Sequence, residues 1–181
     1  MRYSYLLCVI CFLLCLNNVT YASPAHLDTA RNYVGTKEIV NNGGYQVEQF
    51  LKSVGLQKGF SWCAAFVSYC LDKAKNKFQI RSALARKFIT SKSIPAIKVL
   101  QRRVSIPKGS LVIWEKGKTI NGHIGFVNKD WCGKSGETIE GNTSPSSKGS
   151  QENGDGVYIK NREIQPYSYF RITHFTLIPE R

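Results

Sequence analysis

Cys63 lies in a stretch of sequence that can make a thiol reactive. Residues 60–74, FSWCAAFVSYCLDKA, follow a glycine and carry their apolar residues at helical spacing. This pattern predicts a helix with Ser61 as its N-cap and Cys63 in its first turn. A helix N-terminus carries partial positive charge and free N–H groups, which stabilise a thiolate and can bind a developing oxyanion. Cys63 is therefore a candidate nucleophile, although buried cysteines also serve as ordinary core residues.

A thiol nucleophile requires a base, and His123 is the best placed of the three histidines. His26 lies near the N-terminus, and His174 lies within a late strand. His123 instead opens the predicted strand 122–128 and shares one strand face with Gly125. We expect this glycine to let a helix approach closely. Taken alone, His123 is equally compatible with a surface residue beside a turn.

A simple hairpin places two further polar residues beside His123. If strands 122–128 and 136–142 pair around a turn near residues 131–132, His123 lies directly opposite Glu140. Opposed residues have Cβ atoms about 5 Å apart, so the carboxylate can hold an imidazole N–H. Asn142 lies two residues further along the same face. A slip of one residue in this assumed register would move the side chains to the other face.

The first 22 residues have the pattern of a secretory signal. Arg2 precedes an apolar run at residues 6–16 that is too short to span a bilayer. The segment then ends in small residues, the last of which is Ala22. We expect cleavage after Ala22 and a secreted or periplasmic product without stable membrane insertion. Residues 23–181 have a length typical of a single domain with a hydrophobic core. We further expect a monomer.

The chain is strongly basic, with a formal net charge of +13. An exported protein of this charge is attracted to polyanions such as anionic wall or envelope polymers. Nucleic acid is not expected as a partner, because the sequence contains no nucleic-acid-binding motif. Eight of the basic residues lie within 81–108, which contains no acid. This segment fits either a solvated helical face or a landing surface for an anionic polymer.

Cysteine spacing leaves Cys63 as the natural free thiol. Beyond residue 22 the sequence contains Cys63, Cys70 and Cys132, an odd number for an exported protein. Cys63 and Cys70 would lie about 10 Å apart along one helix, which is too far for a disulfide. The sequence leaves open whether Cys70 and Cys132 form a bridge.

The order of the predicted elements indicates an α+β domain. N-terminal helices come first, and an antiparallel sheet that packs against them begins near residue 107. We predict helices at residues 27–34, 45–54, 61–74, 80–89 and 96–100. We predict strands at residues 110–115, 122–128, 137–142, 157–160, 167–172 and 174–178.

Four blocks of the sequence resemble the CHAP domain, the cysteine, histidine-dependent amidohydrolase/peptidase family. They are WCAAFV at residues 62–67, GSLVIW at 109–114, GHIGFV at 122–127 and IEGN at 139–142. The blocks occur in the order of the family and at similar spacing, and the resemblance extends from residue 43 to residue 158. It implies a papain-like α+β fold and an enzyme that cleaves amide bonds in peptidoglycan.

The resemblance also implies roles for individual residues. Cys63 corresponds to the nucleophile, His123 to the base, and Glu140 and Asn142 to the third and fourth catalytic residues. Trp62 is expected either to line the substrate cleft or to pack in the core.

A metal is not expected in this chain. Some members of the family bind calcium through an acid-rich loop ahead of the cysteine. Residues 38–61 contain only Glu38 and Glu48 as acids. We therefore expect no metal and no other cofactor.

Together these features predict a cysteine-dependent peptidoglycan hydrolase that acts through a thioester intermediate. The bond is either the N-acetylmuramoyl-L-alanine amide or a stem or cross-bridge peptide bond, and the sequence does not decide between them. One alternative is a secreted, non-catalytic wall-binding module on the same fold. Another is an amidase for a γ-glutamyl or polyamine amide.

Overall fold

A computed structural model of the protein describes residues 22–146 and 154–179. The predicted signal segment, apart from Ala22, lies outside the described residues. The helices are α2 (Ala25–Asn32), α3 (Tyr45–Lys52), α4 (Cys63–Lys73) and α5 (Ala96–Leu100), with a 3₁₀ helix η1 (Ala85–Phe88). The strands are β1 (Ile94–Pro95), β2 (Leu111–Lys116), β3 (Gly122–Val127), β4 (Ser135–Thr143), β5 (Gly156–Glu163) and β6 (Phe170–Thr176).

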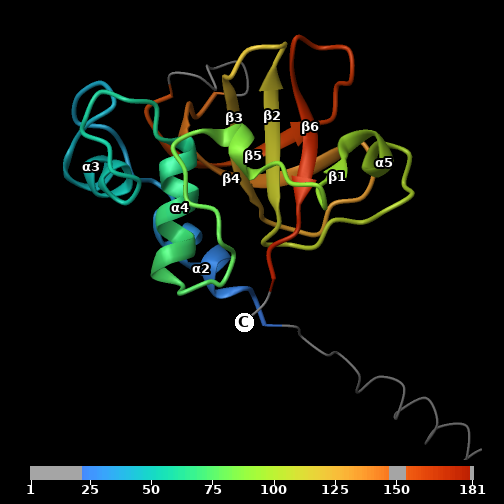
Figure 1. The fold of residues 1–181 in the computed structure, drawn as a ribbon, viewed down its shortest axis with the longest axis horizontal. Helices are drawn as coiled ribbons and strands as arrows, with labels where there is room; N and C mark the ends of the chain where they lie inside the picture. The colour runs from blue at the N-terminus through green and yellow to red at the C-terminus, as the bar shows by residue number, and fades with distance from the viewer. Residues whose placement is uncertain (1–21, 147–153, 180–181) are drawn as a thin grey trace, which may run out of the picture.

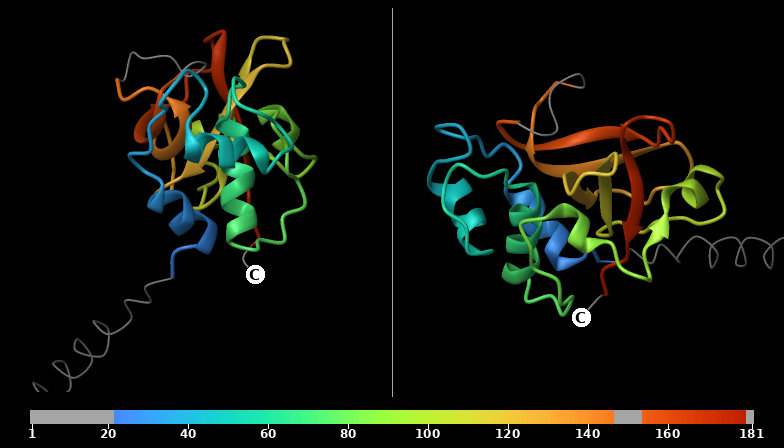
Figure 2. Two further views of the ribbon diagram at one scale, coloured as in Figure 1. Left: turned by 90° about the vertical axis from the view of Figure 1, so that its left-hand side faces the viewer. Right: turned by 45° about the horizontal axis from the view of Figure 1, so that its top comes forward.

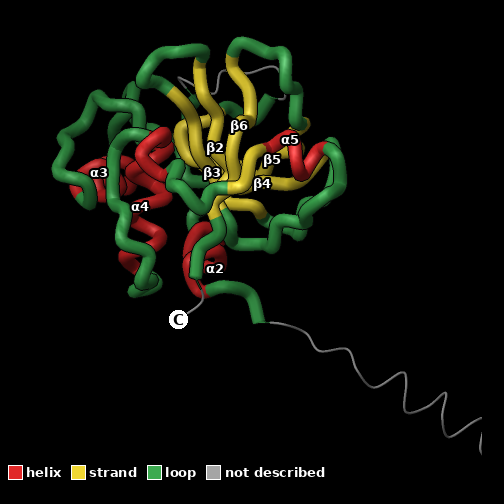
Figure 3. Tube along the Cα trace, turned by 45° about the vertical axis from the view of Figure 1, so that its right-hand side comes forward, coloured by secondary structure: helices red, strands yellow, loops and turns green. Residues whose placement is uncertain are grey.

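The strands form one open antiparallel sheet with helices gathered beside it. The strand order is β1-β6-β2-β3-β4-β5, and each neighbouring pair is antiparallel. Helices α2, α3 and α4 lie together on one side, whereas α5 lies near β1 at the other end (Figure 1). The right-hand view of Figure 2 shows the same separation, and Figure 3 shows it with helices and strands in different colours. The predicted α+β class is therefore confirmed.

The structure differs from the prediction in two regions of the chain. The predicted helix at residues 80–89 is reduced to the single turn η1, and the basic segment 81–108 therefore has no continuous helical face. The two predicted strands on either side of residue 173 form the single strand β6. Its pairing with β2 shifts at this point, because Ile113 pairs with His174 and Trp114 pairs with Ile172. The interruption between the two predicted strands is therefore a β-bulge within a single strand.

Helix α4 is held against the sheet by a buried aromatic cluster. Phe50 of α3 lies 5.2 Å from Phe66 of α4 and 5.5 Å from Trp62, measured between ring centroids. The same core contains Ile124 and Phe126 of β3. A second core on the opposite sheet face is built around Trp131 and Phe175. Burial of this apolar surface fixes the position of α4, and with it the position of Cys63.

Gly141 of β4 is the residue that lets α4 approach closely. A Cβ atom at this position would lie 2.7 Å from the Trp62 ring and 2.9 Å from Phe66, and both side chains are fully buried. Gly125 does not have the predicted role, because its space is filled by the Glu140 side chain, 2.7 Å from a Cβ at that position. A close contact between helix and sheet therefore occurs at Gly141, next to Glu140 on β4.

We expect Gly141→Ala to destabilise the fold, because neither aromatic neighbour can move without disturbing the core. Overpacking of this kind costs about 1–3 kcal/mol. The free energy of unfolding in urea measures the effect. A Gly141→Ala variant as stable as the wild type would show that the contact between α4 and β4 is loose.

Candidate active site

Cys63 is the first residue of α4, and no side chain caps this helix within the described part of the chain. The N-cap position is Trp62 and not the predicted Ser61. The first-turn N–H groups therefore receive no side-chain acceptor and point to the region around the Cys63 thiol. Only 7% of Cys63 is exposed, so the thiol lies at the floor of a groove and not on an open surface.

Trp62 is placed in the core and not on the cleft wall. Its side chain is fully buried against Phe50, and its indole N–H donates a hydrogen bond of 2.7 Å to Glu38. Glu38 also accepts a hydrogen bond from the backbone N–H of Asn42. Trp62 thus anchors the start of α4 to the loop before α3. The substrate contact expected for Trp62 is not available to a side chain in this position.

His123 and Glu140 meet in the buried interior beside the groove. The imidazole Nε2 lies 2.9 Å from the Glu140 carboxylate, and both side chains are completely buried. The strand register differs from the predicted one by two residues, because Gly125 and not His123 lies opposite Glu140. A shift of two residues keeps both side chains on the same face. The predicted contact therefore forms diagonally across the two strands.

Arg162 completes this buried cluster and was not identified from the sequence. It lies on β5, and its guanidinium donates from Nε and Nη2 to the two Glu140 oxygens at 2.7 and 2.5 Å. The Thr138 hydroxyl adds a hydrogen bond of 2.6 Å to the same carboxylate. The pairing of β5 with β4 depends on long-range packing. Nothing in the local pattern around Arg162 distinguishes it from the other basic residues.

The hydrogen-bonded neighbours of Glu140 determine its charge. Burial alone would raise the pKa of the Glu140 carboxyl, but hydrogen bonds and charges from Arg162 and His123 hold this pKa well below its ordinary value. Burial lowers the pKa of His123, whereas hydrogen bonds and charges from Cys63 and Glu140 raise it, with a net result of about 9. The imidazole is therefore cationic at neutral pH while its carboxylate partner is anionic.

The second nitrogen of His123 is available to the thiol. Nε2 is engaged by Glu140, and Nδ1 has no hydrogen bond of ordinary geometry to any described residue. The Cys63 side chain is among the groups that raise the pKa of His123. The Trp114 ring packs edge-on against the imidazole at 5.2 Å between centroids. This packing and the Glu140 contact together fix the ring orientation.

Asn142 lines the groove but does not support His123 as expected. A register shift separates Glu140 from Thr143, and Asn142 has a φ of 54° within this irregularity. Its amide group donates to the Asn42 side chain at 3.1 Å and accepts from the Gly154 backbone at 3.2 Å. Asn142 therefore joins β4 to the segments that carry Asn42 and Gly154, because the irregular backbone turns it away from the regular strand face.

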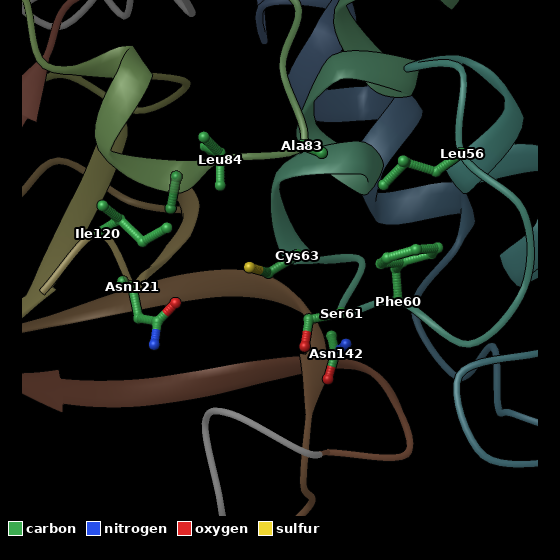
Figure 4. Close-up of a pocket in the computed structure, with 11 residues that line it drawn as sticks. Leu56, Phe60, Ser61, Cys63, Ala83, Leu84, Ile120, Asn121 and Asn142 are labelled. Carbon is green, nitrogen blue, oxygen red and sulfur yellow. The ribbon is translucent and has the colours of Figure 1, made fainter.

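The groove above Cys63 has a volume of about 540 Å³. Apolar side chains form its two ends, with Leu56 and Phe60 on one side of the sulfur and Leu84 and Ile120 on the other (Figure 4). Polar groups are contributed by Ser61, Asn121 and Asn142. Within the described residues, no charged side chain lines this groove.

The other candidate features lie away from the groove. Cys70 is buried, which raises the pKa of its thiol, whereas Cys132 is exposed, and the two are not bridged. In residues 22–146 and 154–179, no three His, Cys, Asp or Glu side chains form a group that could hold a metal ion. None of the helices in the same ranges is both long and apolar enough to cross a membrane.

An α+β fold that brings a thiol at a helix N-terminus next to a charged imidazole has the arrangement used in nucleophilic thiol catalysis. The family model of the CHAP domain matches residues 55–142, which contain Cys63, His123 and Glu140. This segment therefore belongs to the CHAP family, and membership implies peptidoglycan hydrolase activity of the amidase or peptidase type. Arg162 lies outside the matched residues. No curated protein and no solved structure matched the chain, and the papain-like fold remains a prediction.

We expect Arg162→Met to be strongly destabilising, because it leaves the buried Glu140 carboxylate without its two guanidinium bonds. Breaking one partner of a buried ion pair costs about 3–5 kcal/mol. The exposed pair Lys134–Glu163, which also involves β5, provides a control. Lys134→Met should cost at most about 1 kcal/mol in the same urea unfolding experiment. Equal losses in the two variants would contradict the importance of the Arg162 contact.

The raised pKa of His123 predicts a specific dependence of stability on pH. Its interactions stabilise the folded state fully below the ordinary pKa of 6.5, and this contribution is lost as the pH rises through about 9. The stability advantage of the wild type over His123→Gln should therefore shrink between about pH 6 and about pH 10. Urea unfolding of both proteins across this range measures the difference. A difference that stays constant would mean that His123 is not preferentially charged in the fold.

Proposed function

We propose that this protein is a cysteine-dependent hydrolase that cleaves a peptidoglycan amide bond through a thioester intermediate. The observation that carries the proposal is the joint position of Cys63 at a helix N-terminus and His123 in a buried contact with Glu140. Membership of the matched segment in the CHAP family supports the substrate class. The bond is either N-acetylmuramoyl-L-alanine or a peptide bond of the stem or cross-bridge.

His123 moves the proton in the proposed reaction. In the reactive pair the proton of Cys63 already lies on Nδ1 of the cationic His123, and the thiolate attacks the amide carbonyl. The imidazolium is stabilised by the Glu140 carboxylate, which Arg162 keeps ionised. His123 then protonates the leaving amine as the C–N bond breaks, which leaves an acyl-thioester on Cys63. Water activated by His123 hydrolyses this thioester, so that the thiol and a carboxylic acid are formed.

The start of α4 supplies the charge stabilisation that the attack requires. The carbonyl oxygen becomes an oxyanion in the tetrahedral intermediate, and the Cys63 backbone N–H together with a second donor would bind it. The uncapped helix end supports this role, because the described residues contain no side chain that occupies these donors. The apolar ends of the groove exclude water from the reacting atoms, which strengthens these interactions.

The proposed location follows from the sequence alone. Residues 1–22 would direct export, and the mature chain would act as a monomer outside the cytoplasmic membrane. Its net positive charge would attract it to anionic wall or envelope polymers.

Purified protein without residues 1–22 should release new amino groups from isolated peptidoglycan sacculi. Cys63→Ala and His123→Ala should each lower the rate by more than about a hundredfold, because the nucleophile or its base is removed. Cys132→Ser is the matched control, because this thiol is exposed and lies outside the groove, and it should retain activity. Mass spectrometry of the products identifies the bond: new N-terminal alanine indicates the muramoyl amide, and new stem-peptide ends indicate endopeptidase action.

Two results would contradict the proposal in different ways. Full activity in Cys63→Ala would exclude Cys63 as the nucleophile. Wild-type protein that binds sacculi but releases no amine would instead favour a binding module. Cleavage of a γ-glutamyl or polyamine amide, with sacculi left intact, would change the substrate class but keep the chemistry.

A further inference from the structure

A second hollow adjoins the groove at the end formed by Leu84 and Ile120. These two side chains line both the groove and the hollow, so they form a lip between them. Figure 4 shows them across Cys63 from Leu56 and Phe60. The hollow has a volume of about 310 Å³, and its other lining residues are Arg86, Lys87, Lys118 and Thr119.

Arg86 lines this hollow, but its guanidinium already has partners within the protein. Its guanidinium forms an ion pair with Glu115 of β2 and donates a hydrogen bond to the Thr119 carbonyl. These contacts join η1 to the turn between β2 and β3. The ion pair and the hydrogen bond of Arg86 therefore connect the two walls of the hollow.

Lys87 and Lys118 provide the charge that remains unpaired. Lys87 lies on η1 and Lys118 on the turn between β2 and β3, and both are exposed. Neither ammonium has a hydrogen-bond or ion-pair partner in the part of the chain that the structure describes. With Arg86 balanced by Glu115, the hollow retains a local charge from two lysines.

The groove and the hollow differ in charge, and this difference predicts how a substrate would lie across them. The described side chains that line the groove are neutral, and along the surface the lysines begin only beyond Leu84 and Ile120. A substrate that lies along both would place an uncharged amide over the thiol and an anionic group between the lysines. Ammonium groups beyond Leu84 and Ile120 attract an anion without adding charge next to the catalytic imidazole.

We propose that the Arg86–Lys87–Lys118 hollow is a subsite for a carboxylate of the peptide substrate, carried on the substrate beyond the amide that Cys63 attacks. This assignment rests on the proposed peptidoglycan amide hydrolysis, in which the stem peptides supply free carboxylates. A phosphate of an anionic envelope polymer offers related chemistry, and the experiment separates these two sources.

The test uses Lys87→Gln/Lys118→Gln and a stem peptide in two forms, one with free carboxylates and one with carboxamides. For the carboxylate peptide the double variant should raise KM by about three- to tenfold, the range expected for the loss of two partly exposed ion pairs. Its KM for the carboxamide peptide and its kcat should not change. Lys92→Gln/Lys98→Gln, which removes two exposed lysines from outside the hollow, should leave both KM values as in the wild type.

Other outcomes would overturn the assignment. Equal effects of the two double variants would show general charge attraction and not a subsite. Equal KM values of the wild type for the two peptides would exclude carboxylate recognition while leaving the amide hydrolysis intact. Competition by poly(glycerol phosphate) that depends on Lys87 and Lys118, without discrimination between the peptides, would assign the hollow to a phosphate polymer.

Binding separates failure of the subsite from failure of the proposed function. If wild-type protein cleaves neither peptide, the function proposed above is wrong for this substrate. The affinity of Cys63→Ala for the two peptides, measured by calorimetry, still tests the hollow. Tighter binding of the carboxylate form that is lost on Lys87→Gln/Lys118→Gln supports the subsite, and equal affinities reject it.

Discussion

The buried contact of Glu140 with Arg162 and His123 is the constraint on which the rest of the site depends. A carboxylate removed from water is costly unless its oxygens are hydrogen-bonded and its charge is balanced. Here the guanidinium, the imidazole and the Thr138 hydroxyl together satisfy both oxygens. The carboxylate can therefore stay ionised in the interior, and an ionised carboxylate is what keeps the neighbouring imidazole charged and correctly oriented.

One strand connects this cluster to the nucleophile. Successive residues of a strand point to opposite faces, so β4 directs Glu140 toward His123 and Gly141 toward the start of α4. The glycine sets how closely Trp62 and Phe66 approach the sheet. The same short segment of β4 thus fixes the position of the thiol and the position of the base. A displacement of β4 would move both.

The sequence predicts the parts of this arrangement that depend on local periodicity. Helical spacing was sufficient to place Cys63 at a helix start, and the strand period of two kept His123 and Glu140 on one face despite a register error of two residues. Arg162 could not be found in this way, because its contact depends on which strand lies beside β4. Asn142 was misplaced because an irregularity in β4 breaks the alternation. The predicted helix at 80–89 is wrong, because tertiary contacts determine the backbone conformation of this segment.

The distribution of charge follows from what the imidazole requires. A cation beside His123 would disfavour its protonated form and oppose the effect of Glu140. The strongly basic composition of the chain makes such a contact difficult to avoid, and ion pairs with carboxylates limit its effect. Arg162 bonds to both Glu140 oxygens and keeps this carboxylate ionised beside His123, and Arg86 is paired with Glu115. Neutral groove walls then separate the remaining lysines from the reacting atoms, so attraction of a polyanion and proton transfer do not compete.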